Sequence, residues 1–202
     1  MNPANSSLHV GIDEAGRGCL AGPVYAGAAI LLPENLNHPY SEKIRDSKKL
    51  SAHQREELFK WLQTNHRIGI GFATVEEIER FNILNASLMA MQRAFDNLSL
   101  SIDELQKCHV FVDGNQPIKG FKYPQTTVVG GDDSMKCISA ASIVAKVSRD
   151  HEMSRLDGIY QGYGLAGHKG YATEVHRAAI KKLGPTEIHR KTFGGVREFI
   201  RS

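Results

Sequence analysis

The sequence predicts an α/β fold, in which short strands alternate with helices along the chain. Two observations lead to this prediction. Apolar residues recur with a period of two in short segments, the first of them at Leu8, Val10 and Ile12. Segments with helical spacing and capping residues lie between and after them. With 202 residues, 41% of them hydrophobic, the chain can form one compact domain with a small appendage.

Five short segments are expected to be strands, because each is apolar or alternating and is bounded by turn-forming residues. They lie at residues 8–12, 25–32, 68–72, 109–113 and 126–129. The first two are expected to pair with each other. The loop between them contains Gly16-Arg17-Gly18, which is too rich in glycine for a helix. This loop brings main chain close to the acids that end the first strand, so it is a candidate site.

Helices are expected between and after these strands. Capping boxes that begin at Ser51 and Thr74 predict helices near 51–64 and 74–81. Segment 134–151 has few polar positions, so its helix should be largely buried. A last helix is expected from Thr173 to a stop at Gly184. Another helix carries one apolar stripe that faces the core, formed by Leu84, Leu88, Met91, Phe95 and Leu98.

Positive charge is concentrated in the C-terminal part of the chain. Residues 168–202 contain eight Lys and Arg against three Asp and Glu, while the remaining residues contain 17 against 19. This asymmetry is typical of contact with a polyanion, although a basic helical face is more often simply solvated. Because the stretch after about residue 152 is helical and basic, we expect a catalytic domain over residues 1–152. A small basic helical subdomain, residues 153–202, is expected to pack on it.

Cysteine usage and hydropathy bear on where the protein works. Cys19, Cys108 and Cys137 contain no C-x-x-C pair and cannot all pair internally, which fits free thiols in a reducing compartment. No apolar stretch approaches the roughly 20 residues that a membrane helix needs, and the first residues do not resemble a signal peptide. We therefore expect a cytoplasmic monomer that does not associate with membranes and has no obligate protein partner.

Four acidic residues stand at expected element boundaries. Asp13 and Glu14 follow the first strand, Asp113 ends a later one, and Asp132 precedes the buried helix. Hard divalent cations prefer oxygen ligands, and two ions about 4 Å apart can activate water and stabilise the leaving oxygen of a phosphodiester. Each acid also has an ordinary alternative role, as a turn residue, a strand end or a charge at a helix N-terminus. Spacing alone leaves both interpretations open.

Ordered motifs over nearly the whole chain resemble the ribonuclease HII family. Residues 9–24, His-Val-Gly-Ile-Asp-Glu-Ala-Gly-Arg-Gly-Cys-Leu-Ala-Gly-Pro-Val, are similar to the opening signature of that family. Further blocks agree in order and spacing, at residues 46–50, 112–115, 131–132, 138–147, 149–150, 168–171 and 189–193. The resemblance implies a ribonuclease H-like fold, with a mixed central sheet flanked by helices and a helical C-terminal subdomain.

The resemblance also implies an activity. The family is that of metal-dependent endonucleases that hydrolyse the RNA strand of RNA/DNA hybrids and cut on the 5′ side of single ribonucleotides in duplex DNA, leaving 3′-hydroxyl and 5′-phosphate ends. Its four acidic ligands correspond to Asp13, Glu14, Asp113 and Asp132. Asp132 keeps the family spacing to the helix that follows, so it is preferred to Asp133. Two Mn²⁺ or Mg²⁺ ions per site are implied.

Substrate contacts are implied in the same way. In the family the main chain at Gly16, Arg17 and Gly18 meets the ribose 2′-hydroxyl and the adjacent phosphate, and Tyr171 stacks on the sugar after the ribonucleotide. The ordinary alternatives are a tight turn and a packed rim tyrosine. Gly130 stands where the family usually has a lysine, which removes one positive charge beside the site. Further phosphate-binding candidates, each of which could be merely solvated, are Lys48, Lys49, Lys146 and Lys169.

Three alternatives remain to be tested. Another nuclease of the same fold, such as a DNA junction resolvase, would share the clustered acids. A catalytically inactive module would bind hybrids without cleaving them. A zinc site is disfavoured, because His168, His176 and His189 are not spaced as a ligand set and have no cysteine partner, so they are interpreted as phosphate-binding or structural groups.

Overall fold

A computed structural model describes residues 7–44 and 50–200. Within these residues five strands form one sheet in the order β3-β2-β1-β4-β5. Strands β1 and β2, and β2 and β3, are antiparallel, whereas β1 and β4, and β4 and β5, are parallel. The mixed sheet confirms the expected fold class, and a strand is found at each predicted segment. The strands are β1 (Leu8–Ala15), β2 (Val24–Ile30), β3 (Arg67–Ala73), β4 (Cys108–Asp113) and β5 (Gln125–Val128).

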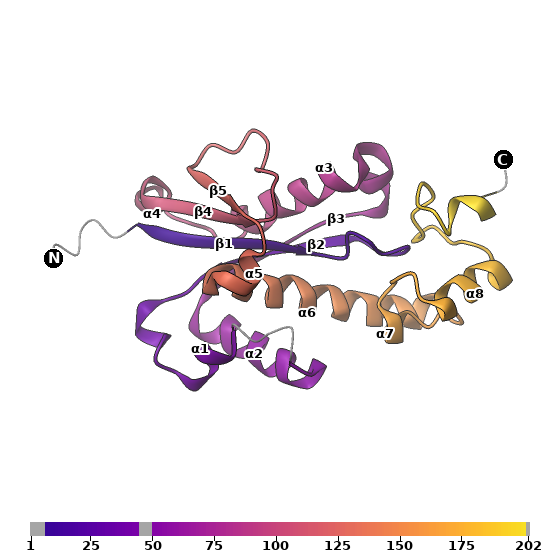
Figure 1. Cartoon of the computed structure of the whole chain (residues 1–202), viewed down its shortest axis with the longest axis horizontal. Helices are drawn as coiled ribbons and strands as arrows, with labels where there is room; N and C mark the ends of the chain where they lie inside the picture. Colours follow the sequence, from indigo (N-terminus) through magenta and orange to yellow (C-terminus); the bar gives the residue numbers. More distant parts are fainter. Residues whose placement is uncertain (1–6, 45–49, 201–202) are drawn as a thin grey trace.

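Helices cover both faces of the sheet (Figure 1). One face is covered by α6 (Lys136–Ile159), with α1 (Pro39–Lys43) and α2 (Ala52–Asn65) packed outside it. The other face is covered by α3 (Val75–Asp96) and α4 (Ile102–Lys107). Apolar side chains of the sheet pack against α3 on one side and against α6 and α2 on the other. A short 3₁₀ turn, η2 (Pro33–Asn35), follows β2.

Helix α6 approaches the sheet closely because glycines face it. A Cβ atom on Gly11 of β1 would lie 2.1 Å from the carbonyl carbon of Cys137, and one on Gly27 of β2 would lie 2.3 Å from the Ala141 carbonyl oxygen. Only a residue without a side chain fits at such a distance. The close approach brings residues 142 and 146 of α6 alongside the carboxyl end of β1, where the first acids lie.

Two helix boundaries differ from those expected. The helices expected near 74–81 and 84–98 form one element, α3, which is kinked where Asn82 has non-helical angles (φ 65°, ψ 165°). The Asn82 Oδ1 atom accepts the N–H of Asn85, so the side chain caps the second half of the helix in place of a loop. The buried helix α6 continues to Ile159, so the expected domain boundary at residue 152 lies inside it.

The C-terminal part lies at one end of the sheet (Figure 1). It contains α7 (Leu165–His168), α8 (Glu174–Leu183) and a 3₁₀ turn, η4 (Arg197–Phe199). Its apolar core includes residues from the loop after β1 and from α6, so it is not separate from the rest. This cluster is formed by Leu20, Ala21, Met153, Leu156, Tyr163, Leu165, Ile180 and Val196.

Two further expectations concern thiols and membranes. Cys19, Cys108 and Cys137 are all free and buried, as the sequence indicated. In the described ranges, the helices are too short or too polar to cross a bilayer.

Candidate active site

Three acids meet at one corner of the sheet because of its parallel strands. Strands β1 and β4 are in register at Ile12 and Val112, so Asp13 and Asp113, the next residues, lie at the same level at the carboxyl ends of neighbouring strands. Strand β5 ends beside Asp113, and the chain then enters the short helix α5 (Gly131–Ser134), which carries Asp132. Glu14 follows Asp13 directly.

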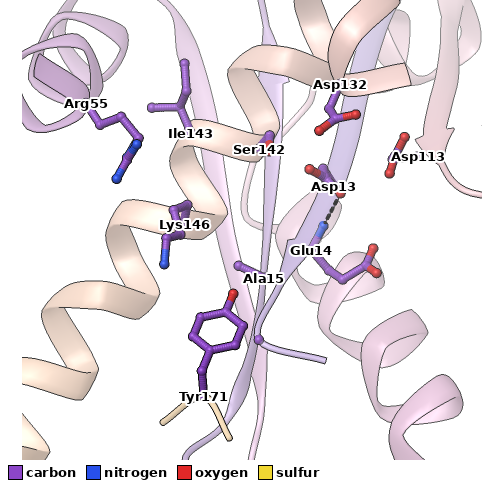
Figure 2. Close-up of a pocket in the computed structure, with 11 residues that line it drawn as sticks. Asp13, Glu14, Ala15, Arg55, Asp113, Asp132, Ser142, Ile143, Lys146 and Tyr171 are labelled. Atoms are coloured by element: carbon purple, nitrogen blue, oxygen red, sulfur yellow. Dashed lines mark hydrogen bonds between the residues drawn. The ribbon is translucent and has the colours of Figure 1, made fainter. Parts of the chain in front are cut away.

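The four acids line one pocket of about 440 Å³, which also contains basic and aromatic side chains (Figure 2). Asp13, Asp113 and Asp132 gather on one side of it, while Lys146, Arg55 and Tyr171 occupy the other (Figure 2). The lining residues come from strands, helices and the C-terminal loop. They are Asp13, Glu14, Ala15, Gly16, Arg55, Asp113, Asp132, Ser142, Ile143, Lys146 and Tyr171.

Asp13 is the most strongly perturbed acid of the pocket. Its side chain is buried, and burial, with the nearby charges of Glu14 and Asp113, raises its pKa to about 8. Hydrogen bonds with the Ser142 hydroxyl and the Glu14 N–H lower the pKa of Asp13, but by less than burial and the nearby charges raise it. Burial also raises the pKa of Glu14, against the lowering effect of Arg17. Burial is therefore the main reason why these two acids hold their protons more tightly than usual.

The carboxylates of the pocket already have hydrogen-bond partners. Asp13 Oδ1 accepts the N–H of Glu14 at 2.7 Å, and Asp113 Oδ1 accepts the N–H of Gly131 at 2.8 Å. The Glu14 carboxylate accepts a hydrogen bond from Arg17 Nη1 at 3.0 Å. Across residues 7–44 and 50–200, no three Asp, Glu, His or Cys side chains are gathered closely enough to hold a metal ion as they stand. Sharing an ion would require these carboxylates to rotate toward one another.

The expected substrate-binding residues are only partly brought together. Gly16, Lys146 and Tyr171 line the pocket, and the Lys146 ammonium lies 5.4 Å from the centre of the Tyr171 ring. Lys146 also pairs with Asp150 at 2.8 Å.

Arg17 is half exposed at the edge of the pocket and pairs with Glu14. Gly18 and Lys169 are not among its lining residues. Lys169 donates to the Ser154 hydroxyl at 2.7 Å. Lys48 and Lys49 lie outside the described residues.

Gly130, the departure from the family pattern, has a left-handed backbone (φ 67°) before α5. A Cβ atom there would meet no other atom within 4 Å, so a lysine at this position would be opposed by backbone strain rather than by crowding.

Sequence reasoning missed two polar residues of the pocket. Ser142 lies beside Asp13 on the sheet-facing side of α6, and a hydroxyl among the apolar residues of a buried helix was the available signal. Arg55 reaches the pocket from α2 and donates to the carbonyl of Leu50. Nothing in the sequence distinguishes it from the other charged residues of this amphipathic helix.

The three C-terminal histidines come together in space, although their spacing in the sequence did not suggest it. The rings of His168 and His176 stack with centres 4.3 Å apart, and His176 Nε2 lies 3.3 Å from His189 Nε2. His176 Nδ1 lies 2.9 Å from the carbonyl of Tyr171, and the N–H of Thr186 donates to His189 Nδ1. Because His176 and His189 are fully buried, they are structural groups rather than phosphate ligands.

The fold and the pocket together define a class of protein. A mixed α/β sheet with carboxylates at the ends of parallel strands, and with lysine, arginine and tyrosine at the opposite wall of the pocket, is the arrangement of a ribonuclease H-like nuclease. This class was expected from the sequence, and the geometry agrees with it.

Comparison with known proteins identifies the family. Residues 10–196 match the family model of ribonuclease HII. A ribonuclease HII of Coxiella burnetii (strain Dugway 5J108-111) is 48% identical over 192 residues, which cover 95% of this chain and 90% of the relative. A ribonuclease HII of Synechococcus elongatus is 48% identical over 185 residues, covering 91% and 83% of the two chains. The crystal structure of ribonuclease H2 from Pyrococcus horikoshii OT3 superposes with a TM-score of 0.75 at 28% identity, covering 95% of this chain and 96% of that one.

The chain therefore belongs to the ribonuclease HII family. It is a ribonuclease H, a phosphodiester hydrolase, as the motifs predicted.

Proposed function

We propose that this ribonuclease H hydrolyses the RNA strand of RNA/DNA hybrids and cuts on the 5′ side of single ribonucleotides in duplex DNA, leaving 3′-hydroxyl and 5′-phosphate ends. The observation that supports this proposal most strongly is that Asp13, Glu14, Asp113 and Asp132 line one pocket with Tyr171 and basic side chains. In this proposal the four acids bind the cations that act on the reacting phosphate, and the opposite wall of the pocket contacts the nucleic acid.

The pocket fits divalent cations by the chemistry of its donors. Its acids offer only carboxylate oxygens, which Mg²⁺ and Mn²⁺ prefer. Burial, together with the charges of Glu14 and Asp113, raises the pKa of Asp13, and a bound cation would offset the cost of ionising this carboxyl group. We propose that Asp13, Glu14, Asp113 and Asp132 hold two Mn²⁺ or Mg²⁺ ions. When bound, such ions lower the pKa of the attacking water and stabilise charge on the leaving 3′ oxygen.

The remaining residues position the substrate. Lys146 and Arg55 place positive charge on the wall opposite the acids, where a phosphate of the scissile strand can bind. The main chain at Gly16 and Gly18 meets the 2′-hydroxyl, and Tyr171 stacks on the following sugar. Arg17 is exposed enough to leave Glu14 for a phosphate, since an exposed ion pair is worth only about 0–1 kcal/mol. Lys169 is proposed to contact a further phosphate, whereas Lys48 and Lys49, the other phosphate-binding candidates, lie outside the described residues.

One assay tests this function and its rivals. A labelled DNA duplex with a single ribonucleotide, a uniform RNA/DNA hybrid and a four-way DNA junction are incubated with the protein in Mg²⁺, in Mn²⁺ and in a chelator. We expect metal-dependent cleavage of the first two substrates, with the single-ribonucleotide duplex cut on the 5′ side of the ribonucleotide. Cleavage of the junction alone would favour a resolvase, and binding without cleavage would favour an inactive module.

The protein is proposed to act as a cytoplasmic monomer without an obligate partner. Light scattering of the purified protein, alone and with the single-ribonucleotide duplex, tests the monomer. We expect a monomer in the first sample and one copy bound per ribonucleotide in the second. A dimer in both samples would contradict the proposed monomer.

A further inference from the structure

Within the part of the chain that the structure describes, two arginines are fully buried without an acidic partner. Arg149 of α6 and Arg190, which follows α8, have no exposed surface. Among the described residues, neither side chain makes an ion pair. Their hydrogen bonds go to main-chain carbonyl oxygens instead. Burying an uncompensated charge is unfavourable, so such an arrangement calls for a function that offsets it.

Nearly all of these carbonyl groups belong to the loop that joins β1 to β2. Arg149 donates to Pro23 at 3.1 Å and to Ala21 at 3.1 Å. Arg190 donates twice to Gly22, at 3.0 and 2.9 Å, and once to Arg17 at 2.8 Å. The planar guanidinium group can hold several acceptors at fixed angles, which a lysine ammonium cannot. The two guanidinium groups therefore hold the loop over residues 16–23 in one conformation through several hydrogen bonds.

Arg149 also connects this loop to Tyr171. Its Nη1 donates to the carbonyl of Lys169 at 2.8 Å, and its guanidinium carbon lies 6.0 Å from the centre of the Tyr171 ring. Gly16 packs directly on the same side chain, because a Cβ atom on Gly16 would lie 2.0 Å from Arg149 Nε. One guanidinium group thus sets the distance between Gly16 and Tyr171, the two parts of the pocket that we assign to the ribonucleotide and to the sugar after it.

The two charges also give the loop a positive potential. Burial and the nearby Arg149 lower the pKa of Arg190 to about 9, so Arg190 remains charged at neutral pH. A charge in a poorly hydrated interior is screened less than a charge at the surface. The side of the loop where Gly16 lines the pocket and Gly18 is exposed is thereby favourable for an anion. A phosphodiester is the anion that this pocket would meet.

We propose that Arg149 and Arg190 are positioning residues that fix the position of the loop over residues 16–23 relative to Tyr171. They also give this loop a positive potential, which favours binding of the phosphate beside the ribonucleotide. This inference rests on the proposed function, because it assumes that the pocket distinguishes a single ribonucleotide from a continuous hybrid.

Arginine variants separate shape from charge. Arg149→Lys and Arg190→Lys keep the charge but lose the planar guanidinium group, whereas Arg149→Met and Arg190→Met lose both. Arg67→Lys is the matched control, since Arg67 also donates to main-chain carbonyls, those of Leu98 and Ser99, and lies at the opposite end of β2 and β3 from this loop. Single-turnover cleavage and KM are measured on the single-ribonucleotide duplex and on the uniform hybrid, in Mg²⁺ and Mn²⁺. Thermal unfolding of each variant is recorded.

We expect the lysine variants to lose about ten-fold or more in the cleavage rate of the single-ribonucleotide duplex, with a smaller loss on the uniform hybrid, because a displacement of about 1 Å in a positioning group can lower a rate by that much. Their KM should change little. The methionine variants should show the same loss of preference together with a KM raised about ten-fold. If the ratio of the cleavage rates on the single-ribonucleotide duplex and on the uniform hybrid is unchanged in every variant, the inference is overturned. Absence of single-ribonucleotide cleavage by the wild type would instead refute the proposed function.

A measurement on the unmodified protein is independent of how the variants fold. Inorganic phosphate is titrated into the wild type while amide signals are followed by NMR. The Gly16 and Gly18 signals should shift in a saturable way, whereas that of Gly158, which lies on α6 away from the loop, should not. If the loop signals respond no more than Gly158, the loop does not carry the positive potential, and the inference fails in that respect whatever the variants do.

Discussion

At the scale of single residues, Asp13 shows a conflict between stability and the proposed activity. Its ionised form destabilises the fold, but the proposed metal binding uses that form. Its carboxylate is buried beside Glu14 and Asp113, and these surroundings raise its pKa to about 8. The folded state therefore favours the neutral acid, whereas an unfolded chain ionises it near its ordinary pKa of 3.8. Between these two values the unfolded state binds fewer protons, so the ionisation of Asp13 makes unfolding easier as the pH rises.

Replacing Asp13 by Asn should consequently abolish cleavage and stabilise the protein. In a chelator at pH 8, the free energy of unfolding of Asp13→Asn should exceed that of the wild type, by at most about 1.4 kcal/mol for each unit of pKa shift. The difference should shrink toward pH 5. Hybrid binding should persist, because the shape is kept. Denaturant unfolding at both pH values checks this, with the exposed Asp96→Asn as control. Near-normal cleavage by Asp13→Asn would contradict the four-acid assignment.

Tyr171 allows a second prediction at this scale. Its ring is exposed at the pocket, 5.4 Å from the Lys146 ammonium, while its backbone is held by His176. Stacking on an aromatic ring is worth roughly 1–3 kcal/mol, so Tyr171→Ala should slow cleavage of a single-ribonucleotide duplex about ten-fold or more. Tyr171→Phe should keep most of the rate. Single-turnover kinetics measure both variants, and equal rates for alanine and tyrosine would show that the ring only packs.

Residue by residue, the site was predictable where a motif carried it. The four acids and Tyr171 belong to ordered motifs, and the pocket contains all of them. Arg55 was not predictable, because it lies within a helix whose rotation about its axis decides whether it reaches the pocket. Ser142 was missed although a hydroxyl in a buried helix was an available signal. Arg149 was part of a recognised motif, but its carbonyl partners depend on a loop conformation that no local pattern encodes.

At the scale of elements, the contact of α6 with the sheet decides the position of the pocket. Helix α6 carries Ser142 and Lys146, and β1 carries Asp13 and Glu14, so a change in their separation changes the pocket itself. Gly27 marks the tightest place on β2, where a Cβ atom would lie 2.3 Å from the Ala141 carbonyl oxygen.

We therefore expect Gly27→Ala to lower both stability and cleavage. An added methyl group in a packed core typically costs about 1–3 kcal/mol, and here it presses against helix backbone. Gly158→Ala, near the C-terminal end of α6, is the control, because its Cβ would meet no atom within 4 Å. Since alanine favours a helix over glycine, this control should gain about 0.5–1 kcal/mol. Denaturant unfolding of both variants measures the difference, and a neutral Gly27→Ala would mean that α6 can move without consequence.

The elements themselves were predictable to different degrees. The capping boxes at Ser51 and Thr74 are both formed, and the helices begin where they predict. A third capping box, Ser101 with Glu104, begins α4, which was missed although its signature is the same. The kink at Asn82 was also missed, because two helical segments in succession do not show whether a loop or a single turned residue joins them. The pairing of β1 with β4 depends on contacts distant in sequence.

At the scale of the whole molecule, the C-terminal residues are part of the catalytic body. The N–H of Gly22 donates to Ile188 at 2.8 Å, and that of Arg190 donates to Leu20 at 2.8 Å. Leu20 and Ala21 share an apolar cluster with Ile180 and Val196. Of the basic residues in this part, Arg190 is buried, so the positive excess is not all available to a polyanion.

The protein should accordingly unfold in one transition rather than in two steps for residues 1–152 and 153–202. Circular dichroism and the fluorescence of Trp61, a buried residue of α2, should report the same midpoint as a probe placed on α8. A lower midpoint for α8 alone would show that the C-terminal subdomain unfolds by itself.

The pH dependence of that transition should reveal the buried histidines. Burial lowers the pKa of His189 to about 4 and also lowers that of His176. The unfolded state protonates these rings near 6.5, so their contribution to stability is complete above pH 6.5 and is lost as the pH falls toward 4. His189→Asn should reduce this loss by at most about 1.4 kcal/mol per pH unit. Unfolding at pH 7 and 5 measures it, with the exposed His53→Asn as control; equal slopes would contradict the assignment.

The hydrogen bond from Arg190 to the Arg17 carbonyl joins residues 173 positions apart. Contacts of such separation form late, because a long loop of chain must close before they can be made. During synthesis all four acids emerge well before residue 190. A nascent chain can therefore possess its acidic residues while the loop over residues 16–23 still lacks one of its two supports. On our proposal, the growing protein cannot select a ribonucleotide until the segment that carries Arg190 has been made and has docked.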